Sequence, residues 1–219
     1  MAPSQFSQRV KHHLVLVLGC LGIFAAMVWL RPGESRLDQL SIATAYTCLL
    51  YMGAALAVGP LIVRRTGTAP LNIYLRRDIG IWSALTGLVH FFVGVDQSMS
   101  PAYLGRYVET TEGLVSPELG RQLFAWGSIA GLVVALLVLL LLGLSNDRML
   151  RRLGAKRWKR LQRSAYWAFA FTIAHGLAFQ ILEYRHGTLI GVLLAVAAVV
   201  VYLQLSARAR STGSSLPDA

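Results

Sequence analysis

The chain has 219 residues, of which 55% are hydrophobic and 14% are charged, and its mean hydropathy is +0.55. Soluble domains carry about 25% charged residues, so this composition excludes an ordinary soluble fold, and the high hydrophobicity excludes disorder. Two cysteines, Cys20 and Cys48, lie inside apolar runs and exclude a disulfide scaffold or a cysteine-rich metal site. The net charge of +11 must therefore be explained by where the basic residues lie.

Six apolar segments are long enough to cross a bilayer as helices, which takes roughly 20 residues each. In chain order they are 14–30, 40–63, 79–95, 122–144, 164–182 and 187–207. Apolar residues run through them without the alternation that a membrane β-barrel requires. The sequence predicts an all-α, polytopic membrane protein, a six-transmembrane-helix bundle in a lipid bilayer. Its expected parts are an N-terminus at 1–13, a membrane domain at 14–207 and a disordered tail at 208–219.

The basic residues are distributed unequally between the two sides of such a bundle. The two termini and the connections 64–78 and 145–163 hold 16 Lys and Arg residues, against 5 on the opposite side. Because cytoplasmic loops are enriched in Lys and Arg, both termini are predicted to be cytoplasmic, in a bacterial-type inner membrane. The basic connection 145–163 is interpreted as this orientation signal, with attraction to anionic headgroups; docking of a soluble electron donor is the alternative. No nucleic-acid partner is expected, because no soluble basic module is present.

Two of the five histidines lie inside predicted spans, where ionisable residues are costly and usually functional. His90 is 13 residues beyond Arg77 on the third span, and His175 is 12 residues beyond Arg163 on the fifth. Both spans cross in the same direction, so at about 1.5 Å per residue both imidazoles lie roughly 18–20 Å from the basic side. The remaining histidines lie at span ends and are interpreted as interfacial polar residues. They are His12, His13 and His186.

Two imidazoles at one height on neighbouring helices can ligate a single iron from opposite faces, and haem leaves two axial positions for a protein. A structural zinc would want four ligands, and neither span supplies more at that level. The alternative is that each histidine is a buried core residue bonded to a backbone group or to a hydroxyl such as Thr86 or Thr172. His90 and His175 are therefore the candidate haem-binding and metal-ligating residues.

Small and aromatic residues surround these histidines. Gly80, Gly87 and Gly94 repeat every seven positions on the third span, which would admit a flat macrocycle or, more commonly, a neighbouring helix. Gly127 and Gly131 on the fourth span are interpreted as helix packing alone. Aromatic residues that could line a haem slot are Trp82, Phe91, Phe92, Trp167, Phe169, Phe171 and Phe179.

Two stretches resemble the ferric reductase-like transmembrane domain family, in particular its haem-containing membrane subunits that serve a periplasmic methionine sulfoxide reductase. One stretch is 76–81 (RRDIGI) continuing to Val89-His90, and the other runs from 153 through 158–163 (WKRLQR) to Ala174-His175. The likeness covers roughly residues 40–182. It implies a six-helix bundle with haem b between spans 3 and 5, ligated by His90 and His175, that passes electrons to an acceptor on the far side.

The chain departs from this family at one position. Members commonly have a second histidine nearer the cytoplasm on span 5, and Gln162 stands there, with Arg77 as its counterpart on span 3. Neither side chain replaces a neutral imidazole, so one haem is expected. A flavin stays open as a further cofactor, although no recognisable flavin domain is encoded. Electrons would then come from quinol or a cytoplasmic reductase and leave to a periplasmic redox acceptor near loop 96–121, which carries Tyr103 and Tyr107.

The leading functional hypothesis is thus a membrane haem b electron-transfer subunit of an oxidoreductase system, with no catalytic residue of its own. One alternative is a haem-free membrane protein for assembly or interaction, in which the histidines are core residues. Another is a small transporter, which is disfavoured because the spans lack a midplane acid and an inverted repeat.

Overall fold

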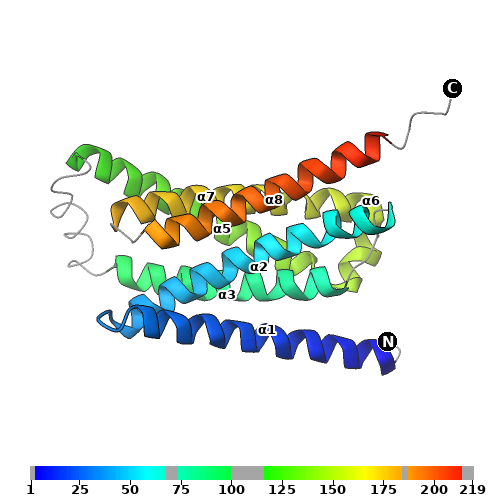
Figure 1. Cartoon of the computed structure of the whole chain (residues 1–219), viewed down its shortest axis with the longest axis horizontal. Helices are drawn as coiled ribbons and strands as arrows, with labels where there is room; N and C mark the ends of the chain where they lie inside the picture. The colour runs from blue at the N-terminus through cyan, green and yellow to red at the C-terminus, as the bar shows by residue number, and fades with distance from the viewer. Residues whose placement is uncertain (1–2, 68–73, 100–115, 184–186, 214–219) are drawn as a thin grey trace.

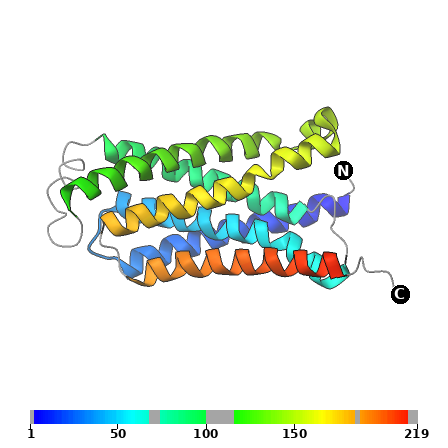
Figure 2. The same cartoon turned by 90° about the horizontal axis from the view of Figure 1, so that it is seen from above.

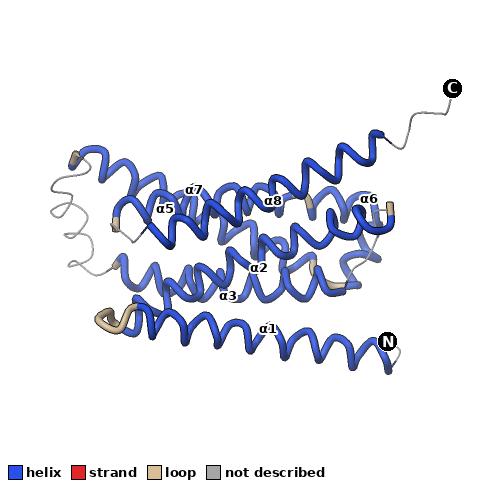
Figure 3. Tube along the Cα trace, in the orientation of Figure 1, coloured by secondary structure: helices blue, strands red, loops and turns tan. Residues whose placement is uncertain are grey.

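The computed structural model describes residues 3–67, 74–99, 116–183 and 187–213. Within these residues the chain forms long helices and no strand (Figures 1 and 3). The helices are α1 (Pro3–Leu30), α2 (Arg36–Thr66), α3 (Tyr74–Ser98), α5 (Pro117–Leu144), α6 (Asp147–Gln162), α7 (Ser164–Leu182) and α8 (Gly187–Gly213). Six helical stretches are long and apolar enough to cross a membrane, the fifth being α7 together with the preceding α6. The predicted six-helix membrane bundle is confirmed.

Each predicted span lies inside one of these helices, and most helices extend beyond it. α2 begins after Ser35, whose hydroxyl accepts the backbone N–H of Asp38, and ends before Gly67, whose φ of 72° only glycine adopts readily. α8 continues to Gly213, so the first residues of the predicted tail 208–219 are helical. Residues 214–219 of that tail lie outside the described residues.

The connection 145–163, expected as a loop, contains helix α6. Asn146 caps the helix by accepting the backbone N–H of Met149 at 2.8 Å, and the residues that follow are mostly good helix formers. Gly154, with φ 72° and ψ 155°, breaks the helix into two parts. The Trp158 indole donates to the Leu144 carbonyl at 2.9 Å and ties the second part to the end of α5. A search for apolar runs misses this helix because it is strongly basic.

α2 lies at the centre of the bundle and contacts α1, α3, α7 and α8, while α5 packs on α3 and α7 (Figure 2). Most of the buried core residues belong to α2, among them Ile42 and Leu49, and Val138 of α5 and Ala168 of α7 join the same cluster. α1 packs on α2 and α3 (Figure 1), and the Tyr51 hydroxyl of α2 donates to the Leu16 carbonyl of α1 at 2.7 Å. α1 begins and α8 ends at the end of the bundle where α6 lies, here called the basic end.

The outer surface of the bundle carries large apolar side chains. Trp29 is 80% exposed, Trp167 67% and Leu132 50%. Such a surface would drive association in water, whereas lipid tails cover it at no cost, so the exposure is that of a multi-pass membrane protein.

Candidate functional site

α3 and α7 bring His90 and His175 together inside the bundle. Their ring centroids lie 5.9 Å apart with the ring planes at 75°, and both residues are half-buried. The sequence prediction that the two imidazoles share one height therefore corresponds to a direct juxtaposition. The two rings meet because α3 and α7 run in the same direction and each histidine lies nearly the same number of residues from the basic end.

Hydrogen bonds to the backbone orient both rings. His90 Nδ1 lies 3.0 Å from the Ser41 carbonyl of α2, and His175 Nδ1 lies 2.8 Å from the Gly127 carbonyl of α5. A carbonyl oxygen only accepts, so each Nδ1 carries the hydrogen, and in a neutral ring Nε2 then holds the lone pair. Metal-ligating histidines are commonly fixed in this way. The hydroxyls considered as alternatives, Thr86 and Thr172, instead donate to carbonyls of their own helices.

The two histidines line a cavity of about 210 Å³, here called the outer cavity. Ser41 and Gln180 add polar groups to a mostly apolar lining. Of the expected aromatic residues, Phe91 and Phe179 line it, and Phe179 stacks on His175 with ring centroids 4.9 Å apart. Phe124 of α5, which the sequence had not indicated, joins them. The other expected aromatics lie elsewhere: Trp82, Phe92, Trp167, Phe169 and Phe171.

Glycines provide the room beside the histidines. A Cβ on Gly131 would lie 2.8 Å from His175 Nδ1, so α5 supports the ring only because this position has no side chain. A Cβ on Gly127 would lie 3.0 Å from Phe179 and 3.1 Å from Ala178, so this glycine lets α5 pack closely on α7. On α3, Gly87 and Gly94 both line the outer cavity; Gly87 packs on the Cys48 thiol, whereas Gly94 has open space at its Cβ position.

The residues present fit a metal held between two imidazoles. A metal–imidazole bond is about 2 Å long and the ring centroid lies roughly 1 Å behind its nitrogen, so two such ligands need centroids about 6 Å apart. The observed 5.9 Å agrees. Within the described residues no group of three or more His, Cys, Asp or Glu side chains could hold a metal. Two imidazoles alone would suit a metal group that supplies its remaining ligands itself.

A second, larger cavity of about 660 Å³, here called the inner cavity, opens at the basic end. Gln162 and Arg77, its counterpart by depth on α3, both line it, as does Gly80. No histidine or cysteine is among its lining residues within the described chain.

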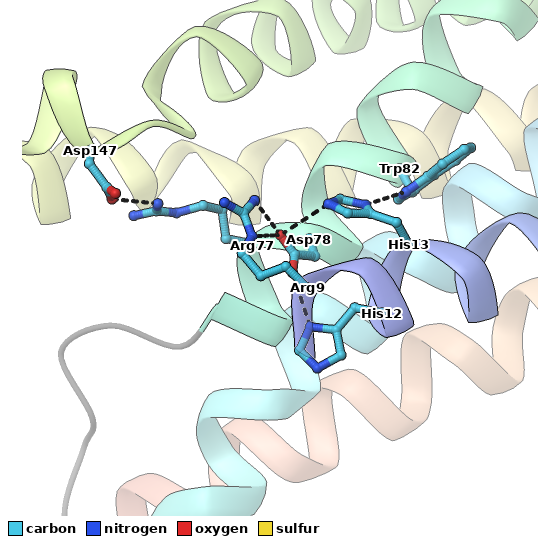
Figure 4. Close-up of polar contacts among 7 residues, drawn as sticks. All are labelled: Arg9, His12, His13, Arg77, Asp78, Trp82 and Asp147. Carbon is cyan, nitrogen blue, oxygen red and sulfur yellow. Dashed lines mark hydrogen bonds and ion pairs between the residues drawn. The ribbon is translucent and has the colours of Figure 1, made fainter. Parts of the chain in front are cut away.

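A buried carboxylate at the basic end has two further histidines, His12 and His13, as neighbours. Asp78 of α3 is fully buried and accepts from Arg9 Nη2 at 2.7 Å, while His12 Nδ1 lies 3.0 Å away (Figure 4). His13 Nδ1 accepts the Trp82 indole N–H at 2.9 Å and its Nε2 lies 3.8 Å from Asp78. His12 and His13, expected as interfacial polar residues, therefore join α1 to α3. The sequence feature that could have indicated this contact is an acidic residue, Asp78, directly before an apolar span, on the same side of the membrane as a basic N-terminus.

The neighbouring Arg77 pairs with a different helix. The Arg77 side chain is 7% exposed, and its guanidinium donates to Asp147 of α6 at 2.6 Å (Figure 4). This contact fixes α6 against the start of α3. His186, Tyr103 and Tyr107, named in the sequence analysis, lie outside the described residues.

Comparisons with known proteins agree with this architecture. The family model of the ferric reductase like transmembrane component matches residues 41–173, which contain His90 and end two residues before His175. The protein-methionine-sulfoxide reductase heme-binding subunit MsrQ of Ralstonia nicotianae is 29% identical over 147 residues. That match covers 66% of this chain and 60% of the relative. Because the family model matches more than half of the chain, this protein belongs to the family of ferric reductase-like transmembrane components.

Proposed function

We propose that this protein is a membrane electron-transfer subunit that holds one haem b, with His90 and His175 as the axial ligands. The observation that carries the proposal is the pair of half-buried imidazoles 5.9 Å apart, each with Nδ1 on a backbone carbonyl. A heme-binding subunit among the relatives supports it. The alternative of two hydrogen-bonded core histidines explains each ring separately but not their juxtaposition.

Haem b, when bound, supplies a one-electron couple inside the membrane. The Ser41 and Gly127 carbonyls hold the two imidazoles in the tautomer that presents Nε2 as a ligand. Phe91, Phe124 and Phe179 keep the surroundings of the rings apolar, which limits water access and so influences the reduction potential.

The direction of electron flow follows from the charge distribution. With the basic end cytoplasmic, in a bacterial-type inner membrane, both termini lie inside and the outer cavity lies nearer the periplasm. A periplasmic redox acceptor then receives the electrons near loop 96–121, and quinol or a cytoplasmic reductase donates them. The name of the relative suggests a protein-methionine-sulfoxide reductase as the acceptor.

A single haem is proposed because Gln162 and Arg77 line the inner cavity, where no imidazole is available among the lining residues described. The guanidinium of Arg77 is already paired with Asp147 and carries only N–H donors, so it does not take the place of an imidazole ligand. A flavin is not assigned to any described residue.

The test is to purify the protein after expression with haem supply, to record reduced-minus-oxidised spectra and to measure haem per polypeptide. We expect a b-type spectrum and a ratio near one in the wild type, and loss of most of the absorbance in His90→Ala and in His175→Ala. His186→Ala, which removes a histidine without an assigned role, serves as the matched control. Full absorbance in both ligand variants would disprove the axial roles, and a ratio near two would disprove the single site.

A further inference from the structure

The inner cavity has a strongly basic rim. Its lining includes five Lys or Arg side chains, contributed by α3, by α6 and its junction with α7, and by α8. They are Arg76, Arg77, Lys159, Arg163 and Arg208. Among the described residues no Asp or Glu lines the cavity, and Asp147, which pairs with Arg77, lies outside the lining. Three helices and the α6–α7 junction thus bring like charges to one cavity, which a bound anion would stabilise.

The same cavity also has apolar walls, beside the polar side chains of Ser83, Ser145, Gln162 and Gln204. Met52 and Leu56 of α2 face Val138 and Leu141 of α5 there, and all four line the cavity. Trp158 and Tyr166, aromatic residues of the kind that lie at membrane interfaces, line it as well. A ligand with an anionic group and an apolar body would match both the basic and the apolar parts of this lining.

We propose that the inner cavity binds an anionic phospholipid, with Arg76, Arg163 and Arg208 around the headgroup phosphate and an acyl chain against the apolar lining. Basic pockets between transmembrane helices are suited to such headgroups, because the charge lies at headgroup level while the walls continue into the hydrocarbon. A soluble phosphate compound shares the phosphate chemistry but would leave the apolar walls unfilled. This inference concerns the basic end only and does not depend on haem at His90 and His175.

The experiment uses the full chain, purified in mild detergent, and native mass spectrometry. Phosphatidylglycerol and phosphatidylcholine with the same acyl chains are titrated separately. The cavity variant combines Arg76→Gln, Arg163→Gln and Arg208→Gln. The matched control combines three exposed α6 arginines that do not line the cavity: Arg148→Gln, Arg152→Gln and Arg157→Gln. Gel filtration establishes that each variant is monodisperse.

We expect one phosphatidylglycerol to bind in preference to phosphatidylcholine. Each Lys or Arg near an anionic group contributes roughly fivefold in affinity, so the cavity variant should bind at least about tenfold more weakly, and the control within about twofold of wild type. A triple Arg→Lys variant of the same cavity positions keeps the charges and should retain most of the binding. If the Gln variant does not fold, Arg208→Gln alone should weaken binding about fivefold.

Three results would overturn the proposal. Equal weakening in the cavity variant and the α6 control would show general attraction to a basic surface. Equal binding of the two lipids would exclude headgroup recognition. Displacement of phosphatidylglycerol by millimolar inorganic phosphate would assign the site to a soluble anion. None of these results bears on the haem ratio, so failure here is distinguishable from failure of the proposed function.

Discussion

The position of His175 depends on the absence of a side chain at Gly131. A methyl group there would lie 2.8 Å from Nδ1 and 2.9 Å from Cε1 of the ring, closer than real side-chain contacts allow. Gly131→Ala must therefore displace the ring and weaken its bond to the Gly127 carbonyl. Helix propensity favours the alanine by about 1 kcal/mol, whereas overpacking costs about 1–3 kcal/mol. We expect Gly131→Ala to lose half or more of the bound haem, measured as haem per polypeptide.

Gly143→Ala is the matched control for this substitution. Gly143 lies on the same helix and has nothing within 4 Å of its Cβ position, so only the gain in helix propensity applies. Haem content should stay at the wild-type level and thermal stability should not fall. Normal haem content in Gly131→Ala would show that the ring contact does not position a ligand.

At the residue scale, the sequence predicted which side chains meet but not what holds them. Counting residues from Arg77 and Arg163 placed His90 and His175 at one height, because the helical rise is fixed. The carbonyls of Ser41 and Gly127 could not be predicted, since they depend on how α2 and α5 are rotated about their axes. Apolar positions cover every side of a membrane helix, so periodicity carries little information on rotation.

At the scale of elements, α1 is attached to the bundle at its basic end by Asp78. This carboxylate is fully buried and faces Arg9, His12 and His13, whereas α1 is otherwise largely exposed. Asp78→Asn removes the charge that balances Arg9, a change that costs about 3–5 kcal/mol in a fully buried pair and less here because Arg9 is 25% exposed. We expect a loss of about 1–3 kcal/mol in stability and faster hydrogen exchange in α1.

The control for Asp78→Asn is Asp96→Asn, at the exposed other end of α3. Thermal unfolding in detergent and hydrogen exchange of α1 are compared between the two variants. Unchanged exchange in α1 after Asp78→Asn would show that the contacts of α1 with α2, including the Tyr51 to Leu16 hydrogen bond, are sufficient to hold α1 in place.

The six spans of the bundle were predictable, because only long apolar helices satisfy their backbone hydrogen bonds within a bilayer. α6 was not, because eight basic residues over 145–163 conceal a capped helix from any search for hydrophobicity.

At the scale of the whole molecule, the unequal charge distribution predicts how the bundle crosses the membrane. α1 begins, α8 ends and α6 lies at one end (Figure 1), and this end carries the inner cavity with its five basic lining residues. Moving so many positive charges across a membrane is costly, so this end should remain in the cytoplasm. We expect Arg148→Cys on α6 to react with a membrane-impermeant maleimide only after cells are opened. A cysteine in place of Gly113, in loop 96–121, should react in intact spheroplasts.

The native cysteines do not interfere with this labelling, because Cys20 and Cys48 lie within predicted spans and Cys48 is buried. A wild-type sample without added cysteines measures any residual reaction. Labelling of Arg148→Cys in intact spheroplasts would reverse the orientation and place His90 and His175 nearer the cytoplasm. The acceptor would then have to be a cytoplasmic protein, although the imidazole pair itself would be unaffected. The sidedness of electron transfer therefore depends on the charge distribution, and the candidate haem site depends on helix geometry.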